Sequence, residues 1–263
     1  DKTIHEFPLY SFVLGDLHAH VINIIFVLTV LALLFAFLLY RKDKMDSLRL
    51  GITIQKEELV KEVFHPIILL LGFFIGLFRT TNFWDFPIYF VVSGAIILFS
   101  NAVLYQFKKK TIILTALHAV VILVIAEITA LPFTLNFNQI STKLRFTVAR
   151  TPFYQLLVLW GLPIILIIIY VRNRWSDLVK EGYITGIIAN RAGDKKSNLN
   201  KLNEDDENIA FVPEKNKLFQ FIENLPVADL FIVTIGLCAI GLILMPEVIY
   251  VQDIYSGDYK RAN

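Results

Sequence analysis

Residues 21–40 read VINIIFVLTVLALLFAFLLY, and the basic run RKDK follows at residues 41–44. About 20 predominantly apolar residues are needed for a helix to cross a hydrocarbon layer of about 30 Å, because each residue adds about 1.5 Å of rise. A short, dense basic flank keeps its side of a transmembrane helix in the cytoplasm. This stretch therefore predicts a membrane span that ends at the cytoplasmic surface.

Working outward from this stretch, five more apolar blocks follow, at residues 67–78, 86–107, 111–133, 153–171 and 227–245. Within the six blocks only Glu127 and Asp229 are charged. The block at 67–78 is too short to cross unaided, so we expect it to recruit residues 79–85 or to stop part-way. The fold class predicted is an all-α integral membrane protein, a six-helix transmembrane bundle with five full spans and one short one.

Composition agrees with this architecture. Of the 263 residues, 56% are hydrophobic and 18% are charged, against roughly 45–50% and 25% in soluble domains. Such an excess of apolar residues excludes a soluble globular enzyme and a disordered chain. The single cysteine, Cys238, excludes an internal disulfide, and a net charge of +2 gives no indication of nucleic-acid binding.

The distribution of basic residues predicts the orientation. Of the 25 Lys and Arg residues, 18 fall in the connections at 41–65, 108–110 and 172–225. We assign these connections to the cytoplasm and a short interfacial helix to Ile52–Phe64 within the first of them. The extracytoplasmic loops are then 1–20, 79–85, 134–152 and 246–263.

These loops and helices make one transmembrane domain over residues 1–263, in the plasma membrane. Both ends of the chain are then extracytoplasmic. Because the chain starts without Met and opens inside a loop, we expect it to be a piece of a larger membrane protein, with further transmembrane segments or chains around it.

Polar side chains that are able to take part in catalysis or binding are concentrated in the predicted extracytoplasmic loops. They are Glu6, Asp16, His18, His20, Arg79, Asn82, Asp85, Glu247 and Asp253. Because they come from three loops that the helices bring to one membrane surface, they are candidates for one functional site. The alternative is that loops in water are polar for solubility alone.

Asp16, His18 and His20 alternate along the sequence. In an extended segment this spacing points the three side chains to one side. A carboxylate with two imidazoles is a candidate ligand set for a divalent metal, and Asp16 is equally a candidate general base. The alternative is that Asp16 caps a helix that starts near Leu17.

The connection at 79–85 adds a second group of candidates. Arg79 is suited to hold a phosphate through its guanidinium, or else to pair with Asp85. Trp84 is a candidate for stacking on a sugar, although a place in the interfacial aromatic belt is the alternative. Asn82 lies between them, and the spacing of Glu247 and Asp253 does not show what these two acids do.

Three further features lie outside this group. Glu127 lies in a span, where an ionisable group is expected to face protein or a cavity, and His118 precedes it in the same block. Asp229 is expected to be a charge at a helix start. Lys143, Arg145 and Arg150 form a basic group for lipid phosphates or for the anionic part of a donor.

The segments EFPLYSFVLGDLHAH (6–20), TNFWDFP (81–87) and PEVIYVQDIY (246–255) resemble the Chlor_Arch_YYY family. Its members are uncharacterised multi-pass proteins grouped with the GT-C membrane glycosyltransferases. The resemblance implies a GT-C-like bundle whose first outer loop carries a catalytic acid and that takes a sugar from a polyprenyl-phosphate donor. Asp16 matches the position of that acid. Family enzymes have a span before this loop, which this chain lacks, and they often continue beyond six spans.

The resulting hypothesis is sugar transfer from a polyprenyl-phosphate donor to an acceptor on the extracytoplasmic side. Asp16, or Glu6, would remove the acceptor proton or hold a metal that polarises the hydroxyl, and Arg79 would stabilise the departing phosphate. The alternatives are a non-catalytic membrane scaffold or subunit of a larger complex and, second, a transporter. For a transport path, the spans offer only His118, Glu127 and Asp229.

Overall fold

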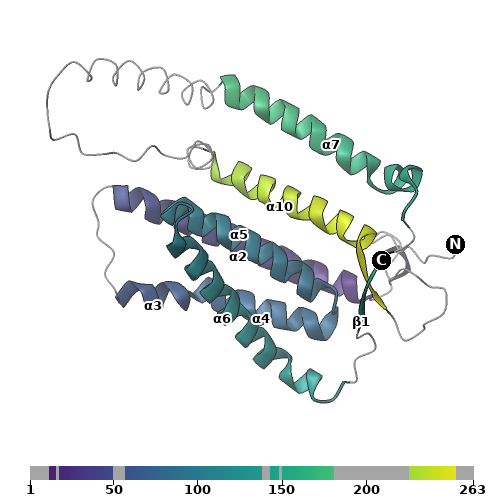
Figure 1. The fold of residues 1–263 in the computed structure, drawn as a ribbon, viewed down its shortest axis with the longest axis horizontal. Coiled ribbons are helices and arrows are strands. Elements are labelled where there is room, and N and C mark those ends of the chain that lie inside the picture. The colour runs from purple at the N-terminus through teal and green to yellow at the C-terminus, as the bar shows by residue number, and fades with distance from the viewer. Residues whose placement is uncertain are drawn as a thin grey trace, which may run out of the picture.

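The computed structural model describes residues 12–15, 18–49, 57–137, 143–147, 150–180 and 225–252. Six helices in these ranges include a segment long and apolar enough to cross a membrane. They are α2 (Ala19–Arg49), α4 (Pro66–Thr81), α5 (Asp85–Tyr105), α6 (Lys109–Thr134), α7 (Phe153–Lys180) and α10 (Val227–Leu244) (Figure 1). The predicted all-α membrane bundle is confirmed.

The short second block becomes long enough by extension at both ends. Helix α4 continues through Arg79 to Thr81, as predicted, and begins at Pro66 after His65 has capped it by accepting a hydrogen bond from the backbone of Ile67. The short helix α3 (Glu57–Val63) precedes it, and together they give an apolar segment of 22 residues, Val60–Thr81. The sequence did not indicate this N-terminal contribution.

Helix α3 lies within the interfacial helix predicted at 52–64, and it buries one charged side chain. Residues 51–56 lie outside the described part of the chain. The carboxylate of Glu62 is buried, at 2% exposure, whereas Val60 and Phe64 are 63% and 55% exposed. Glu62 therefore faces the bundle, where it finds cationic and hydroxyl partners.

The core of the bundle is formed by α2, α4, α5 and α6. Fully buried side chains such as Val30 and Phe37 of α2, Ile75 of α4 and Ile96 of α5 meet in one apolar cluster. A second cluster joins α10 to α2 and α5 through residues such as Leu230, Leu38 and Val103. These five helices therefore make a single packed unit.

The tightest contact is between α4 and α6. A Cβ atom placed on Gly72 would lie 2.8 Å from Cβ of Ile125, and one on Gly76 would lie 2.7 Å from the carbonyl oxygen of Ala126. Only glycine permits this approach. Small residues four apart are a common way for helices to approach in membranes, where the hydrophobic effect does not drive them together.

Helix α7 runs beside α10 on the outside of the bundle (Figure 1). None of its most apolar window is buried. Arg174 of α7 forms an ion pair of 2.8 Å with Asp229 at the start of α10. Near the opposite end, the backbone N–H of Thr151 donates to Glu247 at 2.8 Å. Polar contacts therefore hold α7 to α10 near both of its ends.

Two of the predicted extracytoplasmic loops contain a short antiparallel ladder that the sequence did not predict. Strand β1 (Lys143–Phe146) pairs with β2 (Ile249–Gln252), with Lys143 opposite Gln252 and Phe146 opposite Ile249. The 3-10 turn η1 (Met245–Glu247) leads from α10 into β2. The pairing brings residues 143–146 and 249–252, from two of these loops, side by side at one end of the bundle.

Candidate functional site

The carboxylate of Asp85 lies at the centre of a polar group at the end of the bundle where α2 and α5 begin. Asp85 is the first residue of α5, and the turn after α4 brings Asn82 next to it. The side-chain amides of Asn23 and Asn82 both donate to Oδ2 of Asp85, at 2.7 and 3.0 Å. Among the described residues, none donates a hydrogen bond to Oδ1, so this oxygen is available to a ligand.

Sequence reasoning missed Asn23. It lies one turn into α2, is fully buried, and has no hydrogen-bond partner for Oδ1 within the described residues. A buried amide in a span needs a polar partner. The lone Asn in the otherwise apolar block at 21–40 was therefore a usable signal, although it does not reveal that the partner is Asp85.

Arg79 pairs with Glu127 of α6, which corrects the alternative in which it pairs with Asp85. The close packing of α4 on α6 explains this choice, because Gly76 lies against Ala126, one residue before Glu127. The guanidinium of Arg79 lies 5.5 Å from the ring centre of Phe86. The Glu127 side chain is 55% exposed and that of Arg79 is 16% exposed, so the pair lies at the surface of the protein and not in its apolar core.

Aromatic side chains surround the turn between α4 and α5. Phe83 and Trp84 are 48% and 42% exposed, and their rings meet edge to face. Trp84 immediately precedes Asp85, so its indole is available near the polar group to a sugar face or to the membrane interface. Both roles predicted for Trp84 remain open.

Glu247 has a structural partner at the same end of the bundle. Besides the backbone contact, the hydroxyl of Thr151 donates to its second carboxylate oxygen. Glu247 therefore fastens the segment before α7 to the end of α10, and its predicted role in substrate binding stays a prediction. In the predicted basic group, Arg145 and Arg150 are exposed.

Glu6, Asp16 and Asp253 lie outside the described residues. The carbonyl of His18 accepts hydrogen bonds from Val21 and Ile22 at the start of α2, and His20 is in the first turn. The described part of the chain contains no group of three His, Cys, Asp or Glu residues suited to a metal ion. The trio with Asp16 therefore stays a prediction.

A model of an uncharacterized membrane protein family, DUF2298, matches residues 1–263, the whole length of the chain. The chain belongs to this family. No curated protein and no solved structure shows significant similarity to it. The DUF2298 match agrees with the six candidate spans and assigns no activity.

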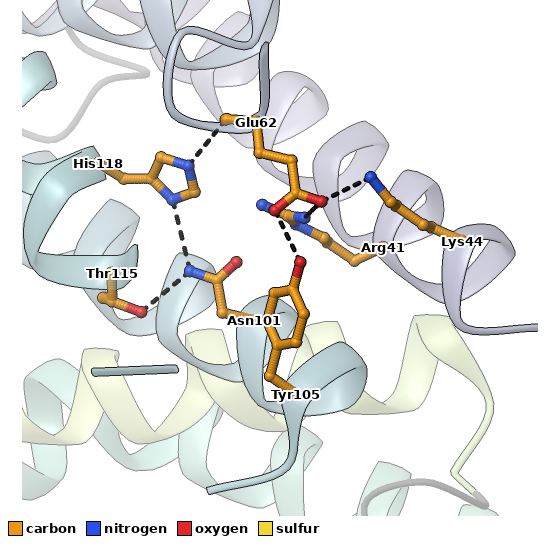
Figure 2. Close-up of polar contacts among 7 residues, drawn as sticks. All are labelled: Arg41, Lys44, Glu62, Asn101, Tyr105, Thr115 and His118. Carbon is orange, nitrogen blue, oxygen red and sulfur yellow. Dashed lines mark hydrogen bonds and ion pairs between the residues drawn. The ribbon is translucent and has the colours of Figure 1, made fainter. Parts of the chain in front are cut away.

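This DUF2298 protein has a second polar group at the opposite end of the bundle, which the sequence did not predict (Figure 2). We call Arg41, Lys44, Glu62 and Tyr105 the Arg41 cluster. The carboxylate of Glu62 accepts from Lys44 at 2.5 Å and from the hydroxyl of Tyr105 at 2.7 Å. Arg41 approaches the same carboxylate at 3.4 Å.

A chain of hydrogen bonds continues from this cluster to α6. Nε2 of His118 lies 3.0 Å from the carbonyl oxygen of Glu62, and Nδ1 lies 3.4 Å from the amide of Asn101. Asn101 also donates to Thr115. His118 therefore ties α3 to α5 and α6, as Figure 2 shows. This contact explains why a histidine occurs within a span without lining a path.

Proposed function

We propose that the Asp85 end of the bundle transfers a sugar from a polyprenyl-phosphate donor to an acceptor hydroxyl on the extracytoplasmic side. The observation that carries the proposal is Asp85 itself. The amides of Asn23 in α2 and of Asn82 in the turn after α4 hold one of its oxygens, and within the described residues the other oxygen receives no hydrogen bond. Carboxylates fixed in this way are suited to orienting sugar hydroxyls. The resemblance to GT-C enzymes supplies the class of reaction.

In this proposal Asp16 is the general base. It matches the position of the catalytic acid that the resemblance to GT-C enzymes implies, and it precedes His18 by two residues in the sequence. Its carboxylate takes the proton of the acceptor hydroxyl as the oxygen attacks the anomeric carbon from the face opposite the phosphate. The bond between that carbon and the phosphate oxygen breaks, and polyprenyl phosphate leaves with the negative charge. Glu6 is the alternative base.

Arg79 stabilises the departing phosphate by exchanging its present partner. The Glu127 carboxylate lies on the surface of the protein, at 55% exposure, so a ligand can replace it at Arg79 without opening the apolar core. A phosphate that carries more charge and accepts two parallel hydrogen bonds is a stronger partner for a guanidinium. Neutralising Glu127 should then help Arg79 to bind the donor.

The test measures transfer of labelled sugar from a panel of polyprenyl-phosphate sugars by the full chain in nanodiscs. Asp16→Asn should lower turnover about 10²–10⁴-fold without changing thermal stability. Asp43→Asn, an exposed acid near the Arg41 cluster, is the matched control and should retain full turnover. Normal transfer by Asp16→Asn, with Glu6→Gln also normal, would overturn the proposal.

A second pair of variants tests the role of Arg79. Arg79→Gln should lower transfer, whereas Glu127→Gln should leave it unchanged or raise it. If the ion pair is only structural, both variants should instead lose stability and activity to the same extent. Equal losses would therefore remove Arg79 from the mechanism.

The scaffold alternative has one observation in its favour. The apolar surface of α7 is unburied within the described chain, as expected where lipid or further helices pack. In a scaffold, Asp16→Asn would leave cellular glycans unchanged. The transporter alternative gains no such support, because His118, Glu127 and Asp229 belong to three separate polar groups.

A further inference from the structure

The Arg41 cluster buries a cation that its neighbours do not satisfy. The side chain of Arg41 is fully buried. Within the described chain, its Nε, Nη1 and Nη2 atoms have no hydrogen-bond partner, and its approach to Glu62 is an ion pair without hydrogen-bond geometry. The Cζ atom of its guanidinium lies 4.8 Å from the centre of the Phe37 ring. This contact provides no hydrogen-bond acceptor for the N–H groups. A buried guanidinium without acceptors is strongly unfavourable.

Glu62 does not supply the missing acceptors. Its Oε1 accepts from Lys44 and its Oε2 accepts from Tyr105. Two cations therefore share one carboxylate, and Lys110 adds a third cation 4.0 Å from the ring of Tyr105. The cluster has an excess of positive charge and of hydrogen-bond donors. A water molecule would accept hydrogen bonds but would leave the charge in place.

We propose that Arg41 and Lys44 bind a phosphate group beside Glu62. A phosphate oxygen pair matches the fork of a guanidinium, and a lysine ammonium adds a point charge. Lys44 has 17% of its side chain exposed, which places it at the rim of the cluster, between Arg41 and the outside. The site therefore takes the phosphate of an anionic lipid headgroup or free inorganic phosphate.

The position of the cluster along the helices suits this ligand. Arg41 and Lys44 lie in the last third of α2, Tyr105 is the last residue of α5, and α6 begins at Lys109. Side chains at the ends of spans lie at the level of lipid phosphates, and basic groups there attract anionic lipids. A lipid headgroup at this surface therefore lies at the same depth as the cluster.

Glu62 acts in this site as an internal competitor for the phosphate. It neutralises Lys44 and part of Arg41, so its carboxylate and a phosphate repel each other. Replacing Glu62 with Gln should therefore raise phosphate affinity, whereas replacing either cation should lower it. Because each substitution alters hydrogen bonds to charged groups, each should change the affinity for phosphate at least about tenfold. These opposite effects on affinity distinguish a binding site from a structural ion pair. In a structural ion pair, all three substitutions would only destabilise the protein.

The experiment uses the full chain in nanodiscs of phosphatidylcholine, with and without phosphatidylglycerol. Native mass spectrometry counts the phosphatidylglycerol molecules retained, and the thermal midpoint is followed during a titration with inorganic phosphate. Arg41→Gln and Lys44→Gln should lose the bound anion, and Glu62→Gln should retain it more strongly. Lys44→Gln keeps the test decisive if Arg41→Gln does not fold. Lys108→Gln, which removes an exposed cation at the same end, is the matched control and should change nothing.

Each outcome decides the proposal. Retained phosphatidylglycerol without a response to phosphate supports the site and assigns it to a lipid headgroup, whereas a saturable response to phosphate supports the site with the free ion as ligand. Absence of both overturns it. An equal loss in Lys44→Gln and Lys108→Gln also overturns it, because that result reports net charge alone, and so does a Glu62→Gln variant that binds no more tightly.

Discussion

Substituting Gly76 with Ala tests the contact on which the Arg79 end of the bundle depends. In the interior of an ordinary helix, replacement of Gly by Ala stabilises by about 1 kcal/mol. At Gly76, however, the new Cβ would lie 2.7 Å from both the carbonyl oxygen of Ala126 and Cβ of Thr129. These atoms belong to the backbone and a β-branched residue of α6, so they cannot turn aside.

The size of the effect follows from the two opposing terms. Overpacking that forces a backbone shift costs about 1–3 kcal/mol. After the gain in helix propensity is subtracted, Gly76→Ala should destabilise the protein by about 0–2 kcal/mol. Gly94 of α5 is the matched control, because no atom of a neighbouring helix lies within 4 Å of its would-be Cβ. Gly94→Ala should therefore stabilise by about 1 kcal/mol.

The assay is reversible unfolding of the full chain in mixed micelles by titration with sodium dodecyl sulfate, followed by tryptophan fluorescence. The two variants should differ by about 1–3 kcal/mol, with Gly76→Ala the less stable. The double variant Gly72→Ala with Gly76→Ala should be less stable again, since Gly72 meets Ile125 at 2.8 Å. If Gly76→Ala is as stable as Gly94→Ala, the close approach of α4 to α6 is refuted.

Three other predictions follow, two tested by the same unfolding assay and one in sealed cells. A double-mutant cycle with Arg79→Gln and Glu127→Gln should give a coupling energy below about 1 kcal/mol, because the Glu127 carboxylate lies on the protein surface at 55% exposure, although Arg79 is 16% exposed. A coupling of 3 kcal/mol or more, on the order of a buried pair, would contradict that reasoning. Asp229→Asn should lower the free energy of unfolding by about 2 kcal/mol, because Asp229 is 7% exposed and accepts hydrogen bonds from both Arg174 and Tyr170. Asp177→Asn, at an exposed position, should leave it unchanged. In a Cys238→Ser background, Asp16→Cys and Asp253→Cys should react with a membrane-impermeant maleimide from the outside of sealed cells and Lys109→Cys only after permeabilisation. Labelling of the first two from opposite sides would contradict a topology of six spans with both loops outside.

The number and approximate bounds of the membrane helices follow from the sequence, because their signal is local. Each apolar block extends over enough residues to decide its state alone, and the charged flanks mark its ends. The short block at 67–78 was the exception. Its length depends on the end of α3, where Val60 begins the apolar segment although the buried, charged side chain of Glu62 interrupts it.

Pairings between helices were not predictable in the same way. That Arg79 pairs with Glu127 rather than Asp85 depends on which faces of α4 and α6 meet, and two glycines decide those faces. The sequence distinguishes neither partner, since both are acids near the same membrane surface. Asn23 and Glu62 were missed for a related reason, because a lone polar residue shows that a partner is needed without showing which one.

The two basic sites differ in what a phosphate must displace. Arg79 already has a carboxylate, so a ligand binds there only by replacing Glu127, which favours a substrate that arrives and leaves. Arg41 is buried, and within the described residues its N–H groups have no hydrogen-bond acceptor. A phosphate that binds there displaces no other acceptor, so we expect it to dissociate slowly. The sequence directed attention to Arg79 because it lies in an interrupted span, and it assigned Arg41 only to the signal for orientation. By this argument exchangeable phosphate belongs to the Asp85 end, and a resident phosphate belongs to the Arg41 cluster.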